Sequence, residues 1–306
     1  MSKPFRDIEW FQRVVELGSI RAAALEARVE PSSVSRTLTR LEARLNTQLL
    51  DRSHGRARIT PAGMRYYEQM RSLLAQILAV ESDVAGDAEQ PKGLLKVNAP
   101  IGFGDRFVAR WLLEFAGTHP DVDIQLTLSS QFVDLRAEGI DLAVRIGRLP
   151  DSSLKASKLA DVPRVLVASP GYLERFGRPS QPEDLAGHEH VFFAPAHRNT
   201  VLKLRGPDGS VHSVERSGRI TVNAINAVVD AVESGFGVHA GPRWAFQASI
   251  DAGKSVELLP DYTMPSLPMQ AVWSPAVLLP ARIRRCVDFM RQSVHSVPGL
   301  KPVGLM

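Results

Sequence analysis

The sequence predicts a two-part α/β protein, with a small helical segment at the N-terminus and a larger domain of alternating strands and helices behind it. The chain has 306 residues, which favours two domains at roughly 150 residues each. Apolar residues make up 44% and charged residues 23%, the balance of a globular protein with a sizeable core. Residues 1–60 carry 11 Lys and Arg against 7 Asp and Glu, whereas residues 61–306 carry 26 of each. The N-terminal part therefore presents either a solvated basic surface or a surface for a large anion, of which nucleic acid is the commonest.

The cysteine content and the absence of long apolar runs indicate in which cellular compartment the protein is expected. Cys286 is the only cysteine, so an internal disulfide or a multi-cysteine metal site is excluded and a reducing compartment is favoured. The first ten residues carry four charges and no apolar run, unlike a secretory signal. No stretch approaches ~18 uninterrupted apolar residues, so no membrane span or membrane partner is expected. We expect a cytoplasmic protein.

Three short helices are predicted in the first 45 residues. Apolar residues recur at helical steps over 5–17, and Gly18 ends that helix. Ser19 is a plausible N-cap for an alanine-rich second helix over about 20–28. After a tight connection, Pro31 suits the first position of a third helix, which runs to about residue 45.

The third helix has two distinct faces. Its predicted buried stripe consists of Val34, Leu38, Leu41 and Leu45. Its basic stripe consists of Arg36, Arg40 and Arg44. A small helix, a short turn and a basic helix with serines at its start are typical of a helix-turn-helix. Residues 47–60 look extended around a turn at 53–56, which predicts a basic hairpin, or wing, beside the third helix.

A long helix is predicted from Thr60, as N-cap, and Pro61 to about residue 84. Its apolar residues follow heptad spacing over nearly three heptads: Tyr66, Met70, Leu73, Ile77, Val80 and Val84. We interpret this seam as a dimerisation helix; the alternative is packing against the core of the same chain. Residues 83–92 have the composition of a hinge.

From Gly93 onward, predicted strands alternate with helices. Strands are predicted at 94–97, 123–128, 142–145 and 165–168, and helices at 106–118 and 132–138. This βαβ alternation predicts mostly parallel sheets, with ligands at the carboxyl ends of the strands.

A co-linear set of motifs covers nearly the whole chain. In the N-terminal part these are Phe11, Val14, Glu16, Gly18-Ser19, Ala22-Ala23, Val34-Ser35-Arg36, Leu41-Glu42, Leu49, Arg52 and Ile59-Thr60-Pro61-Ala62-Gly63. In the later part they are Pro100, Phe103-Gly104, Phe115, His119-Pro120, Gly139 to Gly147, Ala168 to Leu173, Gly235 to Val238, and Pro242. This set resembles the LysR-type transcriptional regulators.

The resemblance implies a winged helix-turn-helix at 1–60, a linker and dimerisation helix with a hinge at 61–90, and an effector-binding domain at 91–306. That domain would have a periplasmic-binding-protein-like α/β fold, with lobe one at 91–163 plus 268–295 and lobe two at 164–267. It also implies a homodimer through the linker helix and, commonly, a homotetramer. The chain departs from the family at Glu30-Pro31-Ser32, where Ser-Gln-Pro is frequent, and at Asn46, Leu50 and Gly55. Base preference at the start of the third helix is therefore harder to carry over.

The basic helix and the wing supply the predicted contacts to double-stranded DNA. The N-terminal residues of a recognition helix read base edges in the major groove. We expect Arg36 to form a bidentate contact with a guanine, and Pro31, Ser32 and Ser33 to touch base edges. Hydroxyl contacts to phosphates are expected from Ser35 and Thr37, and basic contacts from Arg40, Arg52, Arg56 and Arg58. A dimer would read an operator with two-fold symmetric half-sites.

A small-molecule effector is expected in the cleft between the lobes. From lobe one we expect contacts from residues after the first three strands: Ile101, Gly102, Phe103, Ser129, Ser130, Arg145, Ile146 and Gly147. From lobe two we expect Phe193, next to Phe192, and Asn223, which could instead be only a helix N-cap. Backbone N–H groups after the first strand could hold an anion, or the segment could be a plain strand–helix turn. These groups suit a small organic molecule such as a carboxylate or an aromatic acid.

Other protein classes fit the sequence less well. An enzyme is disfavoured because the chain lacks a complete dinucleotide fingerprint, a P-loop, G-x-S-x-G and H-E-x-x-H. No cofactor and no metal are expected, since His188, His190 and His197 are far more typical of histidines in surface loops. A secreted solute-binding protein would need an export signal. An effector-independent architectural DNA-binding protein is the main alternative, and its DNA binding would be neither specific nor effector-sensitive. The sequence leaves open the effector, the operator, the sign of regulation, and dimer against tetramer.

Overall fold

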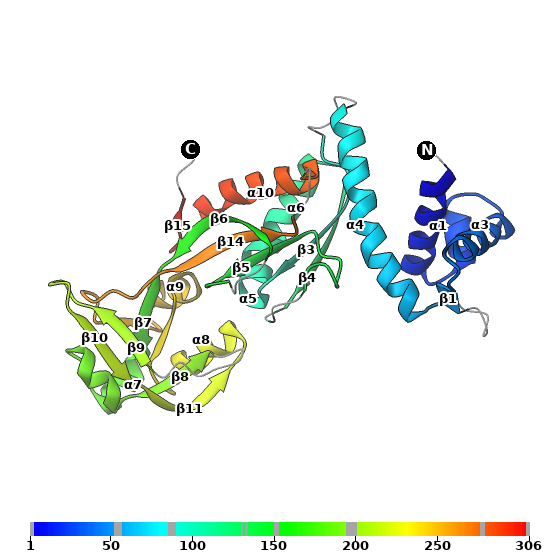
Figure 1. Ribbon diagram of the computed structural model, residues 1–306. Coiled ribbons are helices and arrows are strands. Elements are labelled where there is room, and N and C mark those ends of the chain that lie inside the picture. Colours follow the sequence, from blue (N-terminus) through cyan, green and yellow to red (C-terminus); the bar gives the residue numbers. More distant parts are fainter. Residues whose placement is uncertain are drawn as a thin grey trace. The chain divides into compact units, whose positions relative to one another are not determined.

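The computed structural model describes residues 3–51, 57–84, 90–129, 131, 134–149, 153–193, 201–275 and 279–303. The chain divides into two compact units. Unit 1 comprises Met1–Gln90 with Asp134–Gly139 and Ala276–Ala281, and unit 2 comprises Pro91–Val133, Ile140–Pro275 and Arg282–Met306. Figure 1 labels helices and strands from both units.

Unit 1 contains three short helices, a two-stranded hairpin and one long helix. Its elements are α1 (Lys3–Leu17), α2 (Ile20–Glu26), α3 (Pro31–Leu45), β1 (Leu50–Asp51), β2 (Arg58–Ile59) and α4 (Pro61–Val84). The predicted boundaries arise from local chemistry. Ser19 caps α2 by accepting a hydrogen bond from the Ala22 N–H (3.3 Å), and Pro31 occupies the first turn of α3.

The core of the helix-turn-helix is apolar and continuous. The buried residues that pack together are Phe11 and Val14 of α1, Ala23 and Ala24 of α2, Val34, Leu38 and Leu41 of α3, and Leu49 and Leu50 at the start of the wing. The i, i+3, i+4 spacing of these residues places them on the inner faces of the three helices. The opposite face of α3 is left for solvent or for a partner.

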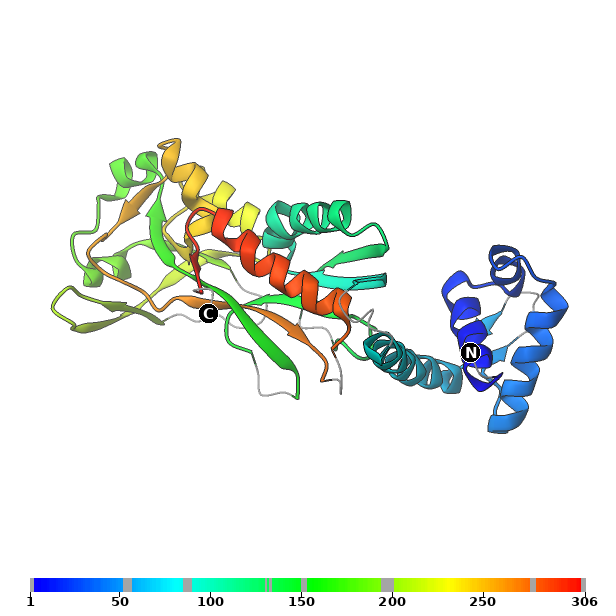
Figure 2. The same ribbon diagram turned by 90° about the horizontal axis from the view of Figure 1, so that it is seen from above.

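Unit 2 begins with a mixed sheet that defines its first lobe. The sheet has the order β15-β6-β14-β5-β3-β4. Its strands are β3 (Gly93–Ala99), β4 (Val122–Leu128), β5 (Leu142–Ile146), β6 (Lys155–Val162), β14 (Leu267–Trp273) and β15 (Lys301–Pro302). Its helical segments are α5 (Ile101–Phe103), a π-helical turn η1 (Gly104–Val108), α6 (Ala109–Thr118), α10 (Ala281–Ser293) and η3 (Val294–Ser296). Figures 1 and 2 both show α10 along β6 and β14, where Arg291 of α10 donates to the Ser157 hydroxyl of β6 (2.8 Å).

The chain crosses to the second lobe at Pro163 and returns at Leu267. The second lobe has a sheet of order β12-β7-β13, the pair β11-β8 and the hairpin β10-β9. Its strands are β7 (Arg164–Ala168), β8 (Glu189–Phe193), β9 (Val201–Arg205), β10 (Val211–Glu215), β11 (Ser217–Val222), β12 (His239–Pro242) and β13 (Val256–Leu258). Its helices are α7 (Pro170–Phe176), η2 (Pro182–Gly187), α8 (Ile225–Glu233) and α9 (Arg243–Asp251).

Strand direction differs from the prediction of mostly parallel sheets. β3 is parallel to β4 and to β5, and β8 is parallel to β11. The other strand pairs of the described residues are antiparallel. The cause in the first lobe is the double crossover: β6 leads out of the sheet, β14 leads back in, and the two lie side by side in opposite directions.

The helix predicted at 132–138 is wrong. Residues 132 and 133 lie outside the described residues, and 135–139 form a single turn. The Asp134 carboxylate accepts from the N–H groups of Arg136 (2.9 Å) and Ala137 (3.2 Å). Gly139 then adopts φ 62°, a left-handed conformation that stops further helical turns.

Candidate functional site

The exposed face of α3 carries most of the predicted base-reading side chains. Pro31, Ser32, Ser33 and Arg36 are exposed, and Ser35 is half-buried. The Arg36 Nε donates to the Ser32 carbonyl one turn earlier (3.3 Å), so the guanidinium lies along the exposed face. This face has hydroxyl groups at the start of a helix and a fork-shaped donor one turn later, which suits hydrogen bonding to base edges.

Arg40 and Thr37 form a local pair. The Arg40 Nη2 donates to the Thr37 hydroxyl (3.1 Å) and lies 3.9 Å from the Asp7 carboxylate of α1. Thr37 is only 7% exposed. The Thr37 side chain lies on the mostly buried face and its hydroxyl accepts from Arg40, so the expected contact of Thr37 with a phosphate stays a prediction. Arg40 itself is exposed and held in one place.

Sequence reasoning missed two positions on this face. Thr39 and Ala43 are exposed and continue the helical spacing of Ser32 and Arg36 at steps of three and four. The same spacing that identified the buried stripe could have found them. They extend the exposed surface of α3 beyond Arg36, toward the C-terminal end of the helix.

The wing is attached to α3 by one carboxylate. The Glu42 Oε1 accepts from the backbone N–H groups of Leu49 (2.9 Å) and Leu50 (3.0 Å). Arg58 is exposed on β2, opposite Asp51 of β1. Arg52 and Arg56 lie outside the described residues. The position of the hairpin beside α3 thus depends on a charged acceptor rather than on apolar packing alone.

Replacing Glu42 with glutamine is expected to loosen the wing. A neutral amide oxygen accepts more weakly from the Leu49 and Leu50 N–H groups, at a cost of about 1 kcal/mol. Hydrogen–deuterium exchange of the peptide that carries these two amides should become faster. Glu30→Gln is the matched control, because Glu30 is exposed and makes no capping hydrogen bond. Equal exchange rates in both variants would show that Glu42 does not hold the wing.

The start of α4 is fixed to the winged domain. The Thr60 hydroxyl accepts from the Gly63 N–H (2.9 Å) and donates to the Gln48 carbonyl (2.8 Å). A side chain at Gly63 would collide with the backbone carbonyl of Leu49, so the close approach requires glycine. The winged helix-turn-helix and the beginning of α4 are therefore packed together as one element.

The predicted heptad seam divides into two parts. Tyr66 packs on Phe11 of the same chain, with ring centroids 5.7 Å apart, and burial raises its pKa. Tyr66 thus packs against the core of its own chain. This is the alternative that the sequence left open for the heptad residues. Further along α4, Met70 and Ile77 are half-buried and Leu73 is 47% exposed. The side chains of Val80 and Val84 lie outside the described residues.

The predicted effector residues of unit 2 follow strand ends in both lobes. Ser129 follows β4, Ile146 ends β5 and is followed by Gly147, and all three are half-buried. Ser130 lies outside the described residues. Phe193 ends β8 and is 42% exposed, and Asn223 follows β11 and is exposed. The N-cap of α8 is Ala224, so Asn223 is not its cap.

Arg145 is a buried guanidinium at the end of β5. It is 7% exposed, and its Nη1 donates to the Asn98 Oδ1 of β3 (2.6 Å). The Asn98 Nδ2 in turn donates to the Thr127 carbonyl of β4 (3.1 Å), which fixes the amide so that its oxygen faces Arg145. Three adjacent strands thus hold a positive charge near their carboxyl ends.

Gly102 and Phe103 contribute to packing between the lobes. A side chain at Gly102 would collide with the Ile225 Cγ2 of α8, so the two helices approach closely there. Phe103 is 1% exposed and meets Trp244 of α9 edge-on, with ring centroids 5.1 Å apart. The expectation that Phe103 touches an effector is wrong for this structure, because its ring is enclosed by aromatic neighbours. Ile101, next to it, is 45% exposed.

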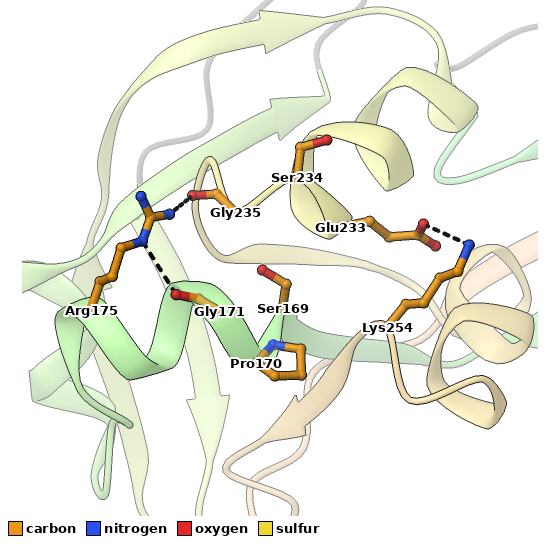
Figure 3. Close-up of a pocket in the computed structure, with 8 residues that line it drawn as sticks. All are labelled: Ser169, Pro170, Gly171, Arg175, Glu233, Ser234, Gly235 and Lys254. Carbon is orange, nitrogen blue, oxygen red and sulfur yellow. Dashed lines mark hydrogen bonds and ion pairs between the residues drawn. The ribbon is translucent and has the colours of Figure 1, made fainter.

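A surface depression on the second lobe contains none of the predicted effector residues (Figure 3). It has a volume of about 670 Å³ and is lined by Ser169, Pro170, Gly171, Arg175, Glu233, Ser234, Gly235 and Lys254. Arg175 donates to the carbonyls of Gly235 (2.9 Å) and Gly171 (3.2 Å). Lys254 lies 3.4 Å from Glu233. The cations of this depression already have partners.

His188 and His190 are 8% and 1% exposed, so the prediction that they lie in surface loops is wrong. His190 forms a hydrogen bond through Nε2 to the Leu185 carbonyl (3.0 Å), and His188 contacts the Tyr172 hydroxyl (3.2 Å). His197 lies outside the described ranges. Within those ranges, no three His, Cys, Asp or Glu side chains come together in a group that could hold a metal ion. None of the helices in the described part of the chain has the length and apolar character needed to cross a bilayer.

Comparisons with known proteins match both parts of the chain to the same family. The model of the bacterial regulatory helix-turn-helix protein, lysR family, matches residues 5–64, and that of the LysR substrate binding domain matches residues 88–294. The HTH-type transcriptional regulator PtxR of Pseudomonas aeruginosa is 33% identical over 291 residues, covering 94% of this chain and 92% of its own. The uncharacterized HTH-type transcriptional regulator YhjC of Escherichia coli K12 is 33% identical over 269 residues, 87% of this chain and 89% of its own.

Solved structures agree with the sequence matches. CrgA of Neisseria meningitidis, a LysR-type transcriptional regulator, has a TM-score of 0.60 at 27% identity, covering 94% of this chain and 98% of its own. A full-length variant of OxyR from Pseudomonas aeruginosa has a TM-score of 0.67 over 100% of this chain and 98% of its own. At 15% identity that second likeness shows the fold alone.

Proposed function

The chain belongs to the LysR family of bacterial transcriptional regulators, and we propose that it reads a two-fold symmetric operator as a homodimer under the control of a small organic effector. Regulators of this family bind DNA through the helix-turn-helix, bind effectors and form oligomers. The relatives of this chain are named as transcriptional regulators, which supports a regulatory role. We place the DNA-binding head at 1–60, the linker helix and hinge at 61–90 and the effector domain at 91–306.

The observation that supports the proposed DNA contacts is that α3 has one buried face and one exposed face. Its apolar side is buried in the core of the helix-turn-helix, so the exposed side is free to contact DNA. Arg36 is assigned to a guanine, with Ser32, Ser33 and Pro31 at neighbouring base edges. Ser35, Arg40 and Arg58 are assigned to phosphates, together with Arg52 and Arg56 of the wing.

The proposed dimer uses the later part of α4. Met70, Leu73 and Ile77 follow heptad spacing, and an exposed leucine in such a seam is stabilised by a partner helix. Val80 and Val84 continue the same spacing. Two heads related by a two-fold axis would read two half-sites of an inverted repeat, and a pair of such dimers would form the tetramer.

The proposed effector site lies between the lobes of unit 2. Arg145, Ser129, Ile146 and Gly147 are assigned from the first lobe, together with Ile101 and Gly102. Phe193 and Asn223 are assigned from the second lobe. A buried guanidinium favours an anionic group on the effector, and an exposed phenyl ring favours an apolar body. Binding would shift the population of lobe arrangements by at most its differential affinity for them.

Selection of bound sequences from random duplexes tests the proposal. The full-length protein is incubated with the pool at ~150 mM salt, where non-specific electrostatic binding is weak. An inverted repeat is expected. An Arg36→Ala variant in parallel should lose the preferred base at one position in each half-site. Recovery of unrelated sequences by a folded, oligomeric protein, with and without candidate small acids, would favour an architectural DNA-binding role.

A further inference from the structure

The surface depression of the second lobe contains a buried serine hydroxyl that the fold does not use. Ser169 is 4% exposed, and its Oγ forms no hydrogen bond within the described part of the chain. Ser169 is the N-cap residue of α7, a position where serine usually accepts a hydrogen bond from a backbone N–H of the first turn. The Ser169 side chain makes no such capping bond. Its hydroxyl is therefore left to the depression that it lines.

A guanidinium borders the same space as this hydroxyl. A Cβ atom on Gly235 would lie 2.8 Å from the Arg175 Nη2 and 3.5 Å from the Ser169 Oγ, so both polar atoms face the gap that this glycine leaves open. The hydrogen bonds of Arg175 use Nε and Nη2 and go to neutral carbonyl oxygens, while Nη1 takes part in neither. The guanidinium carbon also lies 5.3 Å from the ring centroid of Phe176. Arg175 thus has a fixed position, a positive charge and donors left for a ligand.

A carboxylate and an ammonium group lie on the other side of the depression. Lys254 is 3.4 Å from Glu233, and their side chains are 64% and 25% exposed. Figure 3 shows this ion pair and Arg175 on opposite sides of Ser169. The lining consists of charged residues, serines, glycines and one proline. A lining of this composition offers hydrogen bonds to hydroxyl groups rather than a surface for an apolar ring.

We propose that this depression binds a small anion that carries several hydroxyl groups, such as a sugar acid or a sugar phosphate. The anionic group accepts from the Arg175 fork, which matches the oxygens of a carboxylate or a phosphate. A neighbouring hydroxyl pairs with the Ser169 Oγ, and hydroxyls further along the ligand reach Glu233 and Lys254. The volume of about 670 Å³ is typical of small-molecule sites. None of these residues belongs to the proposed effector site, so the second lobe has a binding site of its own.

Thermal unfolding of the full-length protein tests the site with gluconate and glucose-6-phosphate as probes. At about 10 mM and equal ionic strength, at least one probe should raise the melting temperature by about 3–6 °C, as expected at roughly ten times the dissociation constant. Glucose lacks the charge, and acetate and inorganic phosphate lack the hydroxyl groups, so each should give under about 1 °C. An equal shift with acetate or phosphate would reveal an adventitious ion only and would overturn the proposal. The absence of a shift with both probes would overturn it as well.

Substitutions locate the bound probe. Arg175→Gln should reduce the shift to under about 1 °C, and Ser169→Ala should halve it, because one hydrogen bond is worth roughly fivefold in affinity. Arg178→Gln is the control for arginine, since Arg178 is exposed and also donates to a carbonyl, that of Glu257 (3.0 Å). Ser213→Ala is the control for serine, since Ser213 is exposed on β10 of the same lobe. Both controls should respond as the unmodified protein does. A full shift in Arg175→Gln and Ser169→Ala would place the probe elsewhere on the molecule.

Melting in buffer alone separates a binding role of Ser169 from a structural one. Because the Ser169 hydroxyl has no hydrogen bond to lose, Ser169→Ala should keep or raise the melting temperature. A lower melting temperature with the full probe shift retained would mean that the hydroxyl serves the fold, and the proposal would fail.

A charge-conserving variant covers the case in which Arg175→Gln does not fold. Arg175→Lys keeps the charge but loses the fork of donors, so probe affinity should fall about tenfold. Unchanged affinity would show that the probe does not contact Arg175. No DNA is present in these measurements, so their outcome is independent of operator binding.

Discussion

Acidification from about pH 7.5 to about pH 5 is expected to lower the free energy of unfolding of unit 2 by about 4 kcal/mol, or about 2 kcal/mol for each of two buried imidazoles. His190 and His239 are 1% and 4% exposed. Burial lowers the pKa of each to about 4, and the charge of Arg216 adds to the effect in both. Both histidines therefore stay neutral in the folded protein at pH values where the unfolded chain binds a proton.

The direction of the effect follows from this difference. Because the folded pKa lies below the unfolded value of about 6.5, the stabilisation is complete above that value and is lost as the pH falls toward 4. Chemical denaturation at a series of pH values measures the slope. His239→Asn keeps a side-chain N–H for the Val191 carbonyl and should roughly halve the slope, whereas His295→Gln removes an exposed imidazole and is the control. An unchanged slope in His239→Asn would mean that this histidine does not resist protonation.

Replacing Arg36 with alanine is expected to cost about 1–3 kcal/mol of binding free energy at one base position, a loss of roughly 5- to 150-fold. The reason is geometric. The Arg36 guanidinium lies along the exposed face of α3, and its hydrogen bond to the Ser32 carbonyl is one that a base edge can replace. Competition binding with operators that carry single base-pair changes measures the effect.

Arg40→Ala provides the contrast for Arg36. Arg40 is tied to Thr37 and lies near Asp7, at the side of the exposed face rather than along its centre. Its removal should weaken all sequences alike and reduce the salt dependence of binding by about one counterion. Uniform weakening by Arg36→Ala as well would mean that Arg36 contacts only a phosphate.

The elements governed by local rules could be read from the sequence. Helix α3 begins at Pro31, α2 has Ser19 as its cap, and Thr60 caps α4, because each depends on neighbours within four residues. Strand direction could not be read, since an apolar run such as β14 looks the same in either direction. The turn at 135–139 could not be distinguished from a helix, because the conformation of Gly139 decides it.

Some residues of the candidate sites could be predicted and others could not, depending on whether their contacts are local in sequence. Arg36 lies on one helix, and its exposure follows from the periodicity of the buried residues. Phe103 was misread because its partner, Trp244, lies in a distant helix of the other lobe. Non-local contacts of this kind leave no spacing signal.

The aromatic packing between the lobes gives the protein an intrinsic optical reporter. Trp111 of the first lobe and Trp244 of the second are 3% and 5% exposed, and both contact Phe103, with ring centroids 5.7 Å and 5.1 Å away. Indole emission shifts to longer wavelength when the ring gains water. A ligand that separates the two lobes at this point would thus change the fluorescence of the unlabelled protein, and one that leaves them packed would not. Emission spectra can therefore rank ligands by the movement they cause, without any DNA in the cuvette.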